Sequence, residues 1–163
     1  MMQAFESKNF LELAETTHCV HQKSTMPEIL TQQALFRCFL LAYGKCFTSS
    51  GKGRTSLDPK NVFATSPELK TIHYRIMELR HTFAAHNDES GLDDATIKVK
   101  ETSKEFVISH FYSVATPLNE FKDYKLTIKK LEEYIITKAN NQINFLEKKL
   151  NKKIKTRDNK QVI

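Results

Sequence analysis

Apolar residues recur at steps of three and four positions over most of the chain, which predicts a mainly helical protein. Residues Phe5 to about Gln22 alternate apolar and polar side chains in the manner of an amphipathic helix. From Ile29 to Phe47 the chain is apolar on nearly every helical face, so this segment is predicted to be the central and most buried helix. Met26-Pro27 marks its start, because a proline at the first helical position gives up no hydrogen bond.

Two more helices follow from the same pattern. The range 66–83 opens with Ser-Pro-Glu, which supplies an N-cap, a proline and an early carboxylate, and its helix is expected to end near His86. A last helix is predicted to start at Thr116 and to run to about Lys155. At 1.5 Å per residue it would be about 60 Å long. Because that exceeds the width of a small domain, its end is expected to pack on a partner, bend or fray.

The segment from Ala95 to Val114 departs from the helical period. Alternating apolar and polar residues with many β-branched and aromatic side chains predict a small β-hairpin, with a short helix as the alternative for its second half. Phe106, Phe111 and Tyr112 are aromatic residues that could stack on bases, but hairpin aromatics more often pack on the core, and we expect that here.

The expected fold class is therefore mainly α, a helical bundle with a small β-hairpin insertion and a long C-terminal helix. With 163 residues the chain has room for one domain, predicted over residues 1–156, and a basic tail at 157–163 that is expected to be disordered. No stretch approaches the roughly 20 apolar residues of a membrane span, and the first residues do not resemble a secretory signal. Three cysteines without a CxxC pair argue against a disulfide framework or a zinc site, and indicate a reducing, cytoplasmic location.

The charge balance adds one indication of function. The formal net charge is +6 and the isoelectric point is about 9.2. A basic surface attracts the phosphates of nucleic acids, whatever their sequence. Solubility alone accounts for many surpluses of this size, so the charge does not decide the function.

The densest group of polar side chains lies where the 66–83 helix is expected to end. The string ELRHTFAAHNDE places Arg80, His81 and His86 within seven positions and follows them with Asn87 and Asp88. Histidine suits proton transfer near neutral pH, and arginine can hold a phosphate through two hydrogen bonds. On an ideal α-helix, however, Arg80 and His86 would lie about 120° apart, and His81 and His86 about 140° apart. Cations at the negative end of a helix dipole are an equally good explanation of the string.

Other polar residues predict less specific roles. Lys45, Lys52 and Arg54 are candidates for a basic rim that guides RNA, although a solvated loop explains them as well. The glycine-lysine sequence in this loop is not a Walker P-loop, because the glycine spacing differs and a glycine follows the lysine. His18 and His21 share one helical face, but no suitable third ligand is near them in the sequence. We therefore predict no metal and no other cofactor.

The string LRHTFAAHND resembles the signature of the HEPN domain superfamily, an arginine, a polar residue and a histidine a few positions later. Arg80, His81 and His86 match the three positions. The apolar run LFRCFLLAYGKCF followed by SSGKGR is similar to an uncharacterised bacterial branch of that superfamily with links to abortive infection. The resemblance covers roughly residues 33–88, about a third of the chain.

The resemblance implies a small helical bundle that dimerises and cleaves RNA without a metal. Two motifs would face each other across the homodimer, and the 2′-hydroxyl of the RNA would attack the neighbouring phosphate. Arg80 would clamp the phosphate and His86 would act as general acid or base, with His81 or Asn87 orienting the reacting groups. Many family members are toxins or abortive-infection effectors, so an antitoxin or regulatory protein is a further expected partner.

This sequence departs from the family pattern in two ways. It inserts a hairpin after the motif, and no tyrosine follows His86 as it does in toxins whose antitoxin modifies one. The second departure argues against control by that modification. A non-catalytic HEPN-like module that binds nucleotide, RNA or protein stays open as the alternative, as does a dimeric structural module that pairs its long helices.

Overall fold

The computed structural model describes residues 2–17, 24–49, 56–85 and 92–155 of the chain. Within these ranges the protein is mainly helical and has one two-stranded antiparallel sheet. The elements in chain order are α1 (Met2–Thr16), α2 (Met26–Lys45), α3 (Pro59–Val62), α4 (Pro67–Leu79), the π-helix η1 (Arg80–Ala85), β1 (Asp93–Glu101), β2 (Phe106–Val114), the 3-10 turn η2 (Leu118–Glu120) and α5 (Phe121–Leu150). The predicted fold class is confirmed at this level.

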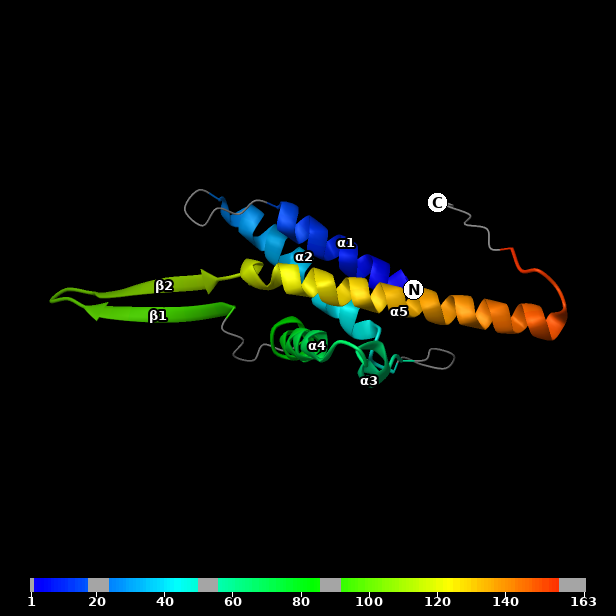
Figure 1. The fold of residues 1–163 in the computed structure, drawn as a ribbon. Coiled ribbons are helices and arrows are strands. Elements are labelled where there is room, and N and C mark those ends of the chain that lie inside the picture. Colours follow the sequence, from blue (N-terminus) through cyan, green and yellow to red (C-terminus); the bar gives the residue numbers. More distant parts are fainter. Residues whose placement is uncertain (1, 18–23, 50–55, 86–91, 156–163) are drawn as a thin grey trace.

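Four helices form the body of the molecule. α1 packs along α2, α5 packs on α1 and α4, and α2 contacts both α4 and η1. Figure 1 shows the β1–β2 hairpin projecting from one end of this body and α5 extending beyond it at the other end. No helix in the described ranges combines the length and apolar character that crossing a bilayer requires.

α2 is the central helix, as predicted. It buries more residues than any other described helix, and its start at Met26 is fixed by the capping box of Thr25 and Glu28. The Glu28 carboxylate accepts hydrogen bonds from the Thr25 backbone N–H at 2.8 Å and from its hydroxyl at 3.0 Å. These bonds supply partners at the end of the helix where backbone donors would otherwise have none.

α1 differs from the prediction at both ends, since it starts at Met2 and ends at Thr16 rather than near residue 22. The buried side chain of Gln32 on α2 explains the end. Its amide donates to the Ala14 carbonyl at 3.0 Å and to the Thr17 carbonyl at 2.8 Å. A side chain from a neighbouring helix thus serves the carbonyls left without partners at this helix end.

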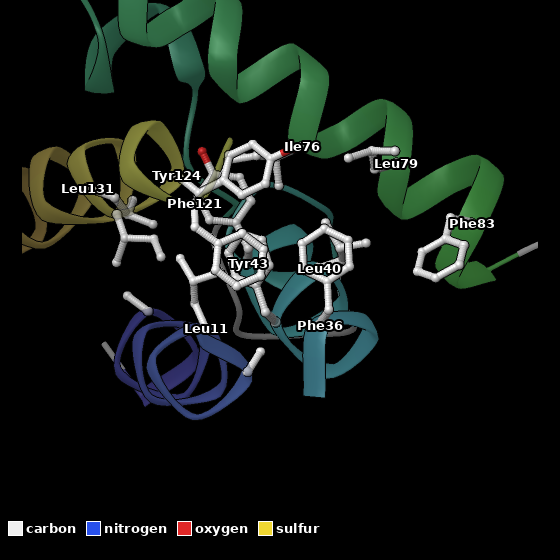
Figure 2. Packing of buried hydrophobic residues seen from close by; sticks show 14 of the residues in the cluster. Leu11, Phe36, Leu40, Tyr43, Ile76, Leu79, Phe83, Phe121, Tyr124 and Leu131 are labelled. Carbon is white, nitrogen blue, oxygen red and sulfur yellow. The ribbon is translucent and has the colours of Figure 1, made fainter. Parts of the chain in front are cut away.

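Aromatic rings from α2 and α5 fill the centre of the core. Phe36 of α2 stacks on Phe121 and Tyr124 of α5, with ring centroids 5.6 Å and 6.2 Å apart. Figure 2 shows these rings between Leu11 of α1 on one side and the apolar side chains of α4 on the other. The Tyr124 hydroxyl donates to the Glu120 carboxylate, which also accepts from Arg75 of α4 at 3.5 Å. The start of α5 is therefore tied to α4 by both apolar and polar contacts.

α4 begins at the proline that the sequence indicates. Ser66 is its N-cap residue and Pro67 its first residue, but the Ser66 side chain makes no capping hydrogen bond. Further along α4, the buried His73 lies among the rings of Tyr43 in α2, Phe47 in the loop that follows, and Phe63 just after α3. Its Nδ1 lies 2.9 Å from the Tyr43 hydroxyl, and its ring centroid lies 4.3 Å from that of Phe47.

The predicted hairpin is confirmed, with β1 and β2 paired from Asp93 and Val114 at the base to Glu101 and Phe106 at the tip. The connecting turn is closed by Thr102, whose hydroxyl donates to the Glu105 carbonyl at 2.9 Å. The expectation that its aromatic residues pack on the core is wrong for the two whose side chains are described. Phe106 is 67% exposed and Phe111 is 50% exposed, because the hairpin projects away from the helices (Figure 1).

The long C-terminal helix is also confirmed, but it is shorter than predicted. The turn η2 precedes it, α5 itself starts at Phe121, and it ends at Leu150 where Asn151 adopts the left-handed conformation. Thirty residues correspond to about 45 Å. After the helix the chain folds back, since the backbone N–H of Ile154 donates to the Glu147 carboxylate at 2.8 Å. Packing of this helix end on a partner stays a prediction.

Candidate functional site

The polar string singled out in the sequence begins where α4 changes its hydrogen-bonding pattern. The α-helix ends at Leu79, and Arg80 to Ala85 form a π-helix with the sequence RHTFAA. π-Helical segments are rare and occur often at functional sites. Because their hydrogen bonds run from residue i to i+5, each residue turns the chain through a smaller angle than in an α-helix. The α-helical angles used in the sequence analysis therefore do not apply to residues Arg80–Ala85, and His86 lies outside the described residues.

Arg80, the first residue of the π-helix, lies against the backbone of α2 at Gly44. A Cβ atom on Gly44 would lie 2.5 Å from Cδ and 2.7 Å from Nε of Arg80, which is too close for any real side chain. Only glycine leaves room for the arginine here. The Gly44–Arg80 contact thus fixes the path of the arginine side chain across α2.

The Arg80 guanidinium has unused hydrogen-bonding capacity. Its Nε is buried and has no hydrogen-bond partner. Across the described ranges the structure contains no ion pair of Arg80 with a carboxylate. A buried donor without a partner is costly, and an oxyanion is the ligand that a guanidinium binds best. Because Nε itself is shielded from solvent, a phosphate would bind this guanidinium through its terminal nitrogens.

Phe83 anchors the π-helix to α2. Its side chain is buried and packs on Phe36, with ring centroids 6.1 Å apart. On its other side the Arg37 guanidinium lies over the Phe83 ring, 4.4 Å from the centroid. Arg37 and Gly44 are seven residues apart on α2, so both belong to the helix face that contacts η1.

Arg37 is a cation beside the candidate site that the sequence analysis did not select. Its signal was its spacing from Gly44, which could be recognised only once α2 was known to pack on the π-helix.

His81 occupies a different environment from Arg80, since its side chain is exposed while that of Arg80 is half-buried. Next to it, the Thr82 hydroxyl donates to the Glu78 carbonyl at 3.1 Å, and Glu78 pairs with Arg75 at 3.1 Å. On this part of the helix, Thr82 is therefore bonded to the backbone, and Arg75 to the side chain of Glu78. The contact that distinguishes Arg80 is the one with Gly44.

The remaining predicted site residues are only partly described. Lys45 is exposed at the end of α2, directly after Gly44, which is consistent with a place at the rim of the site. His86, Asn87 and Asp88 lie outside the described residues, as do Lys52 and Arg54. His18 and His21 lie outside them too, and the described part of the chain has no cluster of three His, Cys, Asp or Glu residues that could hold a metal ion.

The cysteine near the site is not a candidate nucleophile. Cys46 is half-buried two residues after Gly44, and burial raises the pKa of its thiol to about 11. The thiolate is the reactive form of cysteine, so at neutral pH this side chain is inert. Cys38 is also half-buried.

No protein-family model, curated protein or solved structure matches the chain.

Proposed function

We propose that this protein is a HEPN-like, metal-independent endoribonuclease that acts in the cytoplasm as a homodimer, within a defence or toxin–antitoxin system. The observation that carries the proposal is the Arg80 guanidinium, held over Gly44 at the start of a π-helix with a buried Nε that has no partner. This arrangement suits a phosphate, and the sequence around it resembles the HEPN signature. The basic net charge of +6 agrees with an RNA substrate.

The proposed reaction needs only groups from the RNA and from this chain. The 2′-hydroxyl of the RNA attacks the adjacent phosphorus and gives its proton to a base, for which His86 is the candidate. The bond from phosphorus to the 5′-oxygen breaks, that oxygen takes up a proton, and a 2′,3′-cyclic phosphate remains. Arg80 stabilises the charge that develops on the phosphate oxygens.

Other side chains would position the substrate. His81, Asn87 and Asp88 would orient the reacting groups, and Lys45, together with Lys52 and Arg54, would guide the RNA backbone. Of these three basic residues, the structure describes Lys45. It directly follows Gly44, the residue that Arg80 contacts. An antitoxin or regulatory protein would hold the enzyme inactive until it is needed.

RNA cleavage by the purified protein in excess EDTA tests the proposal. We expect the wild type to cut RNA and to leave cyclic phosphate ends, and the double variant Arg80→Ala/His86→Ala to be inactive. Arg75→Ala is the matched control, because it removes an α4 arginine that already pairs with Glu78 and Glu120. Equal cleavage by the wild type and the double variant, each purified in the same way, would contradict the assignment.

A second candidate function is a non-catalytic module that binds RNA, nucleotide or protein. It is favoured by an open hollow of about 450 Å³ at the end of α5, lined by Lys148, Lys152 and Lys153 with three other polar residues. This function predicts binding that weakens as salt is added, without turnover. Unchanged binding after removal of residues 148–163 would exclude the version that uses the tail.

A further inference from the structure

The β1–β2 hairpin has one apolar face and one face that carries lysines. The antiparallel register pairs Ile97 with His110, Val99 with Ile108 and Glu101 with Phe106. Directly paired residues lie on the same face of a sheet, and successive residues alternate between faces. We call the face of these three pairs the apolar face. The opposite face carries Lys98, Lys100, Val107, Ser109 and Phe111.

The apolar face is uncovered in a single chain. Ile97, Val99, Phe106 and Ile108 are each between 58% and 67% exposed. The hairpin projects from the end of the helical body, so none of the helices that the structure describes lies against it (Figure 1). An isolated two-stranded hairpin is only marginally stable in water, and contiguous exposed apolar patches mark sites of interaction. Something is therefore expected to cover this face.

The distribution of charge argues against RNA as the covering partner. Nucleic acids are attracted by lysine and arginine, and the described side chains of the apolar face include neither. The two lysines of β1 lie on the opposite face. There the ammonium group of Lys98 lies over the Phe111 ring, 4.9 Å from its centroid, so this ring is already covered by a cation of the same chain.

We propose that the apolar face packs against the same face of a second copy of this chain. The two-fold axis lies between the two sheets, at right angles to the strands and level with the Val99–Ile108 pair. This arrangement makes the face complementary to itself. It lays the Glu101–Phe106 pair of each copy over the Ile97–His110 pair of the other, which brings the one acidic and the one basic side chain described on this face to the same level. The two hairpins then run in opposite directions, and the helical bodies stay apart at the two ends.

The size of the face predicts a weak dimer. Two strands of nine residues are about 30 Å long and about 10 Å wide, an outline of roughly 300 Å² in each copy. Stable dimers usually bury about 600 Å² or more in each partner. Association through this face should therefore depend on protein concentration. Because this packing keeps the two helical bodies apart, and Arg80 with them, it is a separate contact from the one in which two HEPN-like motifs would face each other. The inference does not require that the protein cleave RNA.

Sedimentation velocity of the full chain over a range of concentrations tests the proposal. We expect the wild type to dimerise, and Val99→Lys to weaken the dimer by at least about tenfold, because a buried ammonium group has no partner there. Val107→Lys is the matched control, since it makes the same replacement in an exposed valine of the opposite face. It should dimerise as the wild type does. A wild type that is monomeric at every concentration, or equal behaviour of the two variants, would overturn the proposal.

Cross-linking tests the position of the two-fold axis. Packed sheets lie about 10 Å apart, so a bifunctional maleimide of about that span should join two copies of Ile108→Cys and should not join copies of Ser109→Cys. The wild type gives the background from its own cysteines. Equal cross-linking of both variants would overturn the proposed packing. A protein that dimerises through this face but cleaves no RNA would contradict the proposed function and leave this inference intact.

Discussion

A Gly44→Ala variant should lose RNA cleavage by on the order of 100-fold while staying folded, and Arg80→Ala should lose at least as much. The added methyl group would lie 2.5 Å from Cδ and 2.7 Å from Nε of Arg80, so the arginine side chain must move. The nearest atoms to that methyl group all belong to this one flexible side chain. The backbone of the site can therefore stay in place while its guanidinium leaves.

The stability of the same variant separates this effect from general damage. Alanine is favoured over glycine in a helix by up to about 1 kcal/mol, which offsets the cost of turning the arginine aside. We expect the free energy of unfolding of Gly44→Ala, measured with urea, to lie within about 1 kcal/mol of the wild type. A variant that cleaves RNA normally would show that the Gly44–Arg80 contact does not position the arginine for catalysis.

The double variant Gly44→Ala/Arg80→Ala provides the control. If Gly44 acts only through Arg80, adding the Gly44 change to Arg80→Ala should reduce cleavage no further, because alanine at position 80 lacks the three atoms that the methyl group would meet first. Losses that simply multiply would instead indicate two independent effects. Comparing the four proteins in one assay therefore tests the positioning role itself.

The features that the sequence predicted well are those decided by neighbouring residues. Pro27 and Pro67 start their helices because a missing backbone N–H is harmless only there, and the alternation from Ala95 to Val114 is a local property of a strand pair. The end of α1 depends instead on Gln32, a residue of another helix. No pattern within α1 could have indicated it.

The candidate site was predictable as a string but not as a geometry. Arg80 and its neighbours stand out in composition, whereas the π-helix depends on a shift of backbone hydrogen bonds for which RHTFAA gives no recognised signal. The contact with Gly44 joins residues 36 positions apart in the chain, so it became visible only when α2 and η1 were packed. The exposure of the hairpin was missed for a related reason. Alternation identifies an apolar face but does not say whether the same chain covers it.

Protonation of His73 should destabilise the fold by up to about 3 kcal/mol as the pH falls from 6.5 to 4. Desolvation by burial, with a smaller contribution from the Lys70 charge, lowers the pKa of His73 from 6.5 to about 4. Only 2% of the residue is exposed. Burial also raises the pKa of the Tyr43 hydroxyl, which therefore stays protonated and forms a hydrogen bond of 2.9 Å with Nδ1 of the imidazole. A proton added to the imidazole would place a charge in this buried site.

The sign of the effect follows from where the proton binds. Between pH 4 and 6.5 the unfolded chain, with an ordinary histidine pKa, takes up a proton that the folded protein excludes. The stabilisation by neutral His73 is thus complete above pH 6.5 and is lost as the pH falls through this window. His73→Gln cannot titrate but can still bond to Tyr43, so its urea-unfolding free energy should fall less steeply with decreasing pH. A slope for His73→Gln equal to that of the wild type would refute the role assigned to His73.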